Sequence, residues 1–142
     1  MSSLIDQALA IALEAHRDQR DRNGAPYILH PLRVMGYVEG EADQVTAILH
    51  DVVEDSDIGL DDLRRAGFGE EIVHAVDCLT RRDTESYEES IERAAADPLA
   101  RRVKLADLRD HLDLQRSHQV RAEDIDRFNR YLAAWQRLQA ER

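Results

Sequence analysis

The sequence is poor in lysine, in cysteine and in net positive charge. Only Lys104 among the 19 basic residues is a lysine, and 29 acidic residues give the 142-residue chain a formal net charge of −10. A chain with this charge has no overall field that attracts nucleic acid or an anionic membrane, so we expect neither as a partner. The single cysteine, Cys78, cannot form an internal disulfide, which is typical of a reducing compartment.

Long apolar runs are also missing. The longest early run covers Ala8 to Leu13, far short of the ~20 residues that a membrane helix needs. No basic segment precedes this run, so we expect no secretory signal and a cytoplasmic protein. Hydrophobic residues at 43% and charged residues at 34% are typical of a globular chain. The length suits a single domain over residues 1–142.

Apolar residues recur at helical spacing almost throughout the chain, and no segment alternates as a strand does. The segment 20–31 contains Asn23-Gly24 and Pro26 and is predicted to be a loop. An all-α domain of about seven or eight helices is therefore expected. Its first helix would be capped by Ser2 or Ser3 and have its apolar face over 4–15, and the others would cover about 32–38, 41–54, 60–66, 70–79, 86–96, 99–114 and 123–138.

The sharpest local feature is the segment His50-Asp51-Val52-Val53-Glu54-Asp55. On a continuous helix, Glu54 lies one turn after His50, and Asp55 lies one turn after Asp51. One helical turn would then present an imidazole and three carboxylates as a single patch. Such groups are costly to bury unless a cation lies among them. The alternative interpretation is a solvated acidic helix face to which the histidine contributes nothing.

Two further positions could complete a metal site. His30 ends the irregular loop directly before Pro31, where a rigid turn can aim a side chain. Asp107 lies between apolar neighbours on a predicted helix, a place where a lone aspartate is more often a surface residue. Together with His50 and Asp51 they make a set of two histidines and two aspartates, which suits manganese, iron or zinc. Such a metal can acidify water and bind a phosphoryl oxygen.

The order of these motifs resembles that of the HD-domain hydrolases of the RelA/SpoT type, which include small stand-alone alarmone hydrolases. The resemblance implies an all-helical HD-domain bundle with manganese-dependent removal of the 3′-pyrophosphate from ppGpp and pppGpp. Because the chain ends at Arg142, we do not expect the synthetase activity of the long family members. The matching residues are His16, Gly24 to Pro31 with the loop before them, Ala47 to Asp55, Phe68-Gly69, Leu79-Thr80, Val103 to Asp107 and, more weakly, Arg130-Tyr131.

The resemblance also implies roles for single residues. Glu54 and Asp55 match the pair that activates and orients the attacking water. The physical chemistry agrees, because a carboxylate next to the metal ligands can take a proton from a water molecule held there. The implied manganese ligands are His30, His50, Asp51 and Asp107.

The loop before Gly24 departs from the family pattern. The family carries two adjacent basic residues there, and both contact the nucleotide. Here Arg22 matches the second of them, but Asp21 occupies the first position. Arg20, one residue earlier, is the candidate substitute. We therefore predict substrate contacts from Arg20 and Arg22.

Two residues near Asp107 are further candidates for contacts with the substrate. Lys104 lies three residues before Asp107, so both side chains can share a helix face. We predict that Lys104 supports the acidic site or the substrate phosphates. The family has asparagine and threonine, which help hold the nucleoside, where this chain has His111 and Leu114. His111 either replaces the amide as a substrate contact or is incidental.

Three functions remain open at this point. The first is manganese-dependent hydrolysis of (p)ppGpp, a small-molecule nucleotide. The second is an HD-domain phosphohydrolase for another nucleotide, which Asp21 and His111 motivate. The third is a non-catalytic helical module that binds an alarmone or a partner. Glu54 and Asp55 argue against the third, because a binding module has no need for them beside four metal ligands. The sequence does not predict an oligomeric state.

Overall fold

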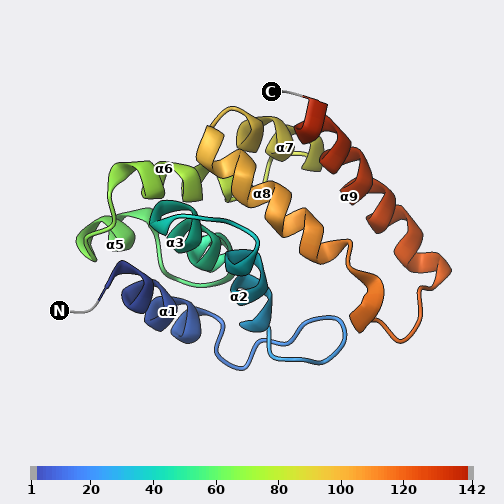
Figure 1. The fold of residues 1–142 in the computed structure, drawn as a ribbon, viewed down its shortest axis with the longest axis horizontal. Coiled ribbons are helices and arrows are strands. Elements are labelled where there is room, and N and C mark those ends of the chain that lie inside the picture. The colour runs from blue at the N-terminus through green and yellow to red at the C-terminus, as the bar shows by residue number, and fades with distance from the viewer. Residues whose placement is uncertain (1–2, 141–142) are drawn as a thin grey trace.

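The computed structural model describes residues 3–140 (Figure 1). Within them there is no β-strand, only an isolated bridge between Arg20 and Pro26. Eight of the described helices have six residues or more, which confirms the predicted all-α class. The helices are α1 (Leu4–Ala15), α2 (Leu29–Gly36), α3 (Glu41–Leu49), α4 (Val52–Asp55), α5 (Leu60–Arg65), α6 (Glu70–Leu79), α7 (Tyr87–Ala95), α8 (Pro98–His111) and α9 (Ala122–Ala140), with a 3-10 turn at Leu114–Arg116.

Side-chain caps begin several of these helices where the sequence predicts a start. The Ser3 hydroxyl accepts the backbone N–H of Asp6 at 3.1 Å, whereas Ser2 lies outside the described residues. Asp97 caps α8 by accepting the N–H of Ala100 at 2.9 Å, and Pro98 occupies the first turn. Such caps satisfy N–H groups that have no partner inside the helix. No helix among residues 3–140 is both long and apolar enough to span a membrane.

The predicted continuous helix over 41–54 is wrong, because the chain leaves the helix at His50 and Asp51. His50 Nδ1 lies 2.6 Å from the carbonyl oxygen of Ala47. In an uninterrupted helix, that oxygen would accept the backbone N–H of Asp51. The imidazole takes the place of this backbone donor, and the chain resumes as the short α4. His50 and Asp51 therefore project from a turn between two helices.

Two other helix boundaries also differ from the prediction. Helix α2 begins at Leu29 rather than near residue 32, because the N–H groups of Leu29 and His30 already bond to carbonyls three residues earlier. Pro31 then falls in the first turn, where its missing N–H costs nothing. Helix α8 ends at His111 rather than near residue 114, since Asp113 caps the separate 3-10 turn that follows.

Helix α3 lies at the centre of the fold and is buried along most of its length. Its residues Ile48 and Leu49 pack against α1 and α6 in one apolar cluster. Small buried residues such as Ala100 and Ala106 on α8 let that helix pack closely on α2 and α3. Figure 1 shows α9 alongside α8, which it contacts through Leu138 among others. The packing thus brings α2, the turn after α3 and the second half of α8 together.

Candidate metal centre and adjoining cavity

The four predicted metal ligands come together from three segments of the chain. His30 lies in the first turn of α2, His50 and Asp51 form the turn between α3 and α4, and Asp107 lies near the end of α8. One ligand atom from each of them lies within 4.8 Å of the ligand atoms of all the others. His30, His50 and Asp107 are each only 3% exposed. The fold therefore assembles a buried cluster that could hold a metal ion.

Individual distances show how closely the donor atoms approach one another. Asp107 Oδ1 lies 2.8 Å from His30 Nε2 and 3.2 Å from His50 Nε2. Asp51 Oδ2 lies 3.0 Å from His50 Nε2. Ligand atoms bind transition metals at about 2.0–2.2 Å, so donors about 3 Å apart can bind the same ion. The two imidazole nitrogens and two carboxylate oxygens thus have the spacing of one coordination sphere.

Burial and charge act in opposite directions on these groups. Burial opposes the charge on His50, but the Asp51 and Asp107 carboxylates outweigh it and hold the pKa of His50 well above its usual value. Burial likewise opposes the charge on Asp51, yet His50 lowers the Asp51 pKa. The pKa of Asp107 is held well below its usual value against burial, first by Lys104. The carboxylates are therefore ionised, and a cation that bound among these groups would have to displace protons from the imidazoles.

Neighbouring side chains hold the carboxylates of Asp51 and Asp107 in place. Lys104 Nζ lies 2.9 Å from Asp107 Oδ2, so both side chains share the face of α8 that the spacing predicts. Burial opposes the charge on Lys104, but the Asp107 carboxylate raises its pKa and keeps it charged. The Tyr27 hydroxyl donates a hydrogen bond to Asp51 Oδ2. Burial and the Asp51 charge raise the Tyr27 pKa, so this hydroxyl keeps its proton.

Glu54 and Asp55 belong to α4, directly after the ligand-bearing turn. Glu54 Oε1 accepts the backbone N–H of Arg81 at 2.9 Å, and Asp55 Oδ2 accepts from Gln19 Nε2 at 3.2 Å. Burial first, and the nearby Asp51 carboxylate as well, raise the pKa of both Glu54 and Asp55. A carboxylate with a raised pKa is a better proton acceptor. These two side chains adjoin the ligands through the turn, not through the single helix face that we expected.

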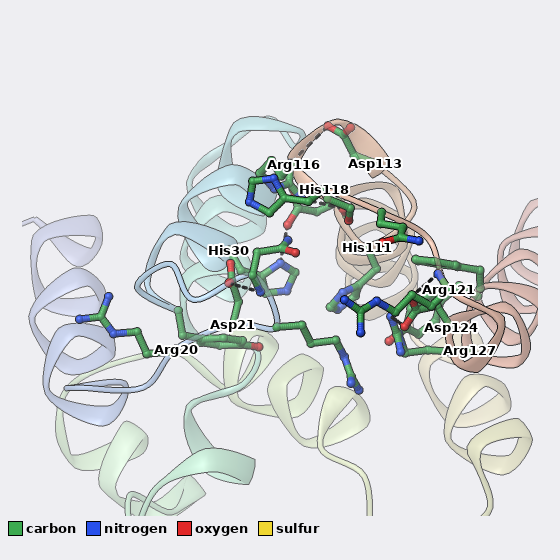
Figure 2. A pocket seen from close by; sticks show the side chains of 18 of the residues that line it. Arg20, Asp21, His30, His111, Asp113, Arg116, His118, Arg121, Asp124 and Arg127 are labelled. Atoms are coloured by element: carbon green, nitrogen blue, oxygen red, sulfur yellow. Dashed lines mark hydrogen bonds and ion pairs between the residues drawn. The ribbon is translucent and has the colours of Figure 1, made fainter.

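A cavity of about 850 Å³ opens beside the cluster, and Figure 2 shows His30 and His111 next to each other in its wall. The predicted substrate contacts Arg20, Arg22 and His111 all line this cavity, whereas Lys104 contacts Asp107 instead. The lining carries six guanidinium groups. They belong to Arg20, Arg22, Arg33, Arg116, Arg121 and Arg127.

Asp21, which departs from the family pattern, has a structural role in the loop. Its Oδ1 accepts the backbone N–H groups of Asn23 at 2.9 Å and Ala25 at 3.0 Å. This carboxylate therefore folds the turn around Gly24, which has a positive φ of 85° that favours glycine. Asp21 fixes the segment that presents Arg20 and Arg22 to the cavity.

His111 joins the metal cluster to an aromatic wall of the cavity. Its ring stacks on Tyr131 with centroids 5.0 Å apart and an interplanar angle of 22°. On its other side the His30 ring lies at 4.6 Å. His111 Nε2 also approaches Asp107 Oδ1 at 3.2 Å. His111 is thus packed between His30, a candidate metal ligand, and the wall of the cavity.

Sequence reasoning missed Asp110, which is only 1% exposed. Its Oδ2 lies 2.6 Å from His30 Nδ1, and Arg33 donates to both of its oxygens. The signal that could have found it is its spacing, because Asp110 follows Asp107 by three residues and shares its helix face. Gln19, the partner of Asp55, had no comparable signal, since it lies in the irregular segment after α1.

An all-helical domain that gathers two histidines and two aspartates at the junction of its helices defines a recognisable class of protein. The HD domain family model matches residues 8–137 of the chain. The chain therefore belongs to the HD domain family.

Comparison with individual proteins shows which members of the HD domain family the chain is similar to in sequence. The chain is 35% identical over 116 residues to the GTP pyrophosphokinase of Streptomyces coelicolor, a match that covers 72% of this chain and 14% of that protein. It is also 35% identical over 121 residues to the guanosine-3′,5′-bis(diphosphate) 3′-pyrophosphohydrolase of Aquifex aeolicus, with 77% of this chain and 17% of that protein covered. The chain thus spans less than a fifth of the length of these relatives.

A solved structure matches over nearly the whole chain. It is described as a metazoan ortholog of SpoT that hydrolyzes ppGpp. The TM-score is 0.80 at 28% sequence identity, and the match covers 97% of this chain and 86% of that one. Together, the family model, the relatives and this structure confirm the resemblance to the RelA/SpoT type that the motifs predict.

Proposed function

We propose that this protein hydrolyses the 3′-pyrophosphate of ppGpp and pppGpp, with manganese as its metal, and releases pyrophosphate with GDP or GTP. The observation that carries the proposal is the buried cluster of His30, His50, Asp51 and Asp107, with one ligand atom of each within 4.8 Å of the others. The solved structure that matches 97% of the chain, described as hydrolysing ppGpp, supports the choice of substrate. The relative named GTP pyrophosphokinase is matched over only 14% of its length, so its name describes a protein that is mostly outside the match.

The chemistry of the donor set fits a divalent transition metal. Imidazole nitrogens mixed with carboxylate oxygens suit manganese, iron or zinc better than calcium, which prefers oxygen ligands alone. The buried carboxylate of Asp107 and the half-buried one of Asp51 also favour a cation between them. His30, His50, Asp51 and Asp107 would hold the ion. When bound, it would supply Lewis acidity to a phosphoryl oxygen and lower the pKa of a water molecule.

The side chains of α4 would carry the proton transfer. Because Glu54 Oε1 is held by the backbone N–H of Arg81, Glu54 Oε2 is left to accept a proton from the attacking water. The water oxygen forms a bond to the phosphorus attached at the 3′ position, and the bond from that phosphorus to the 3′ oxygen breaks. The 3′ oxygen takes up a proton, and pyrophosphate departs. Asp55, fixed by Gln19, orients the water.

The cavity would hold the rest of the nucleotide. Arg20 and Arg22 would provide positive charge for its phosphates, and the stacked pair of His111 and Tyr131 would offer an aromatic surface to the nucleoside. Lys104 would act through Asp107, whose carboxylate it holds. We further propose that this small-molecule nucleotide, and not nucleic acid, is the partner, and that the protein acts in the cytoplasm.

Another nucleotide remains the second candidate substrate, and His111 is the observation that favours it. His111 occupies the position where the family contacts the nucleoside with an amide. An imidazole packed between His30 and Tyr131 presents different hydrogen-bonding groups to a base or a ribose. Release of orthophosphate from a nucleoside monophosphate, without cleavage of ppGpp, would support this candidate.

The test is incubation of the purified protein with ppGpp and Mn²⁺, with analysis of the products. We expect GDP and pyrophosphate from the wild type and no turnover from His50→Ala. His74→Ala is the matched control, because the His74 side chain is 62% exposed and contacts none of the four ligands. A wild type that binds no metal and cleaves no ppGpp would overturn the proposal.

A further inference from the structure

We infer that Asp110 is a positioning residue of the metal centre, whose carboxylate determines which nitrogen of His30 faces the metal. This inference rests on the proposed function, because it concerns the same ligand set. It goes further in assigning a role to a residue outside that set. Asp110 is not itself one of the candidate ligands, and its role in the metal centre is exerted through His30.

The two nitrogens of His30 have different carboxylate partners. Nδ1 lies 2.6 Å from Asp110 Oδ2, and Nε2 lies 2.8 Å from Asp107 Oδ1. All three side chains are at most 5% exposed, so water does not compete for these contacts. An ionised carboxylate only accepts hydrogen bonds, so Asp110 requires a hydrogen on Nδ1. The lone pair of Nε2 is then the one presented to the ion, as when a carboxylate orients a metal-bound histidine.

Two arginines in turn fix Asp110. Arg33 Nε lies 2.7 Å from Asp110 Oδ1, and Arg33 Nη2 lies 3.1 Å from Oδ2. Arg116 Nη2 lies 3.2 Å from Asp110 Oδ1 and also donates to the backbone carbonyl of Asp110 at 3.0 Å. Planar guanidinium groups bind carboxylates in a defined geometry and compensate the charge of a buried carboxylate. Asp110 therefore has one well-determined orientation.

Asp110 lies where its orientation determines how the His30 ring is placed. Asp107 and Asp110 lie three residues apart on α8, and His30 and Arg33 lie three residues apart on α2. The two helices thus meet through two carboxylates that contact His30 from opposite edges of its ring. Without Asp110, the His30 ring could turn or present its other nitrogen. Each binding event would then have to fix the ring in the correct orientation, which would weaken metal binding.

The variant Asp110→Asn tests the inference through metal affinity rather than activity. The amide keeps the size of the side chain, but its one acceptor oxygen would have to serve both His30 and Arg33. Removing the partner of a metal-binding histidine typically weakens metal binding about 10–100-fold. We expect a weakening of this size in the Mn²⁺ dissociation constant, measured by electron paramagnetic resonance of the free ion.

Asp43→Asn is the matched control. Asp43 is also a buried aspartate, and Arg102 holds both of its oxygens at 2.7 and 3.0 Å, but it contacts no metal ligand. We expect its Mn²⁺ affinity to equal that of the wild type. Equal affinity in Asp110→Asn, or equal weakening in both variants, would overturn the inference. A wild type that binds no Mn²⁺ would overturn the proposed metal centre as well, so the two failures are distinguishable.

A second measurement needs no variant and stays informative if Asp110→Asn does not fold. In the wild-type protein loaded with Zn²⁺ as a diamagnetic probe, nitrogen-15 NMR reports which His30 nitrogen carries hydrogen. We expect a protonated Nδ1 that exchanges slowly with water. An Nδ1 without hydrogen would refute the inference directly.

Discussion

Replacing Glu54 by glutamine should separate water activation from metal binding. Glutamine keeps the length of the side chain and the oxygen that accepts the Arg81 N–H at 2.9 Å, so the connection between α4 and the segment after α6 remains. It removes the proton acceptor. General-base catalysis contributes about 10²–10⁴-fold, so we expect a rate loss of that size, equivalent to a barrier increase of about 3–5 kcal/mol.

The stability of this variant follows from the sign of the Glu54 pKa shift. Burial, joined by the nearby Asp51 and Asp55 charges, raises the Glu54 pKa in the folded state. The folded state therefore holds this proton more tightly than the unfolded state, and the group costs stability as the pH rises above its unfolded pKa. Glutamine carries no such charge. We expect the melting temperature of Glu54→Gln at neutral pH to equal or exceed that of the wild type.

The assay combines single-turnover hydrolysis of ppGpp at saturating Mn²⁺ with a Mn²⁺ titration of each protein. Glu39→Gln, at an exposed glutamate after α2, serves as the control and should behave as wild type. If Glu54→Gln keeps its rate, Glu54 is not the proton acceptor. If weaker Mn²⁺ binding accounts for the whole loss of rate, Glu54 is a metal ligand and not the proton acceptor.

Other predictions concern pH and stability. Because the pKa values of His30 and His50 are raised, Mn²⁺ binding should release protons and weaken as the pH falls, and calorimetry in buffers of different ionisation enthalpy would detect this release. Arg93→Ala removes hydrogen bonds to Glu85 and to two backbone carbonyls at the end of α6, and should lower the free energy of unfolding by about 2–3 kcal/mol in urea titrations. Arg93 also lowers the Glu85 pKa to about 2, so the wild type should lose this stabilisation as the pH falls from about 4.5 to 2, whereas Arg93→Ala should not. Leu138→Ala, at a side chain 1% exposed between α9 and α8, should cost about 2–5 kcal/mol.

Helix boundaries set by local contacts could be predicted from the sequence. The Ser86 cap and the Asp97-Pro98 start depend on groups within three residues, and the expected helices at 86–96 and 99–114 begin within one residue of α7 and α8. The break at His50 and Asp51 depends on distant contacts as well as on the local one from His50 Nδ1 to the Ala47 carbonyl. His50 Nε2 faces Asp107, 57 residues away, and Asp51 accepts from Tyr27, 24 residues away. No local pattern contains these contacts.

The same distinction applies to the site. The clustering of its four candidate ligands could be predicted because they lie in short motifs that resemble a known family. Lys104, three residues before Asp107, could be predicted as a support for the site, and the spacing of Asp110 from Asp107 is a similar local signal. The contacts that supporting residues make across the fold could not be predicted. Asp110 reaches His30 across 80 residues of sequence, and Gln19 reaches Asp55 across 36. Such contacts become visible only once packing has brought α2, α4 and α8 together.

The position of the cleaved bond decides whether this protein removes the 3′-pyrophosphate by attack of water. ppGpp is incubated with the protein and Mn²⁺ in water enriched in oxygen-18, and the products are analysed by mass spectrometry. Attack of water on the 3′-linked phosphorus predicts GDP without label and pyrophosphate carrying one oxygen-18 atom. Label in GDP, release of orthophosphate, or no hydrolysis would show that the protein does not catalyse this reaction.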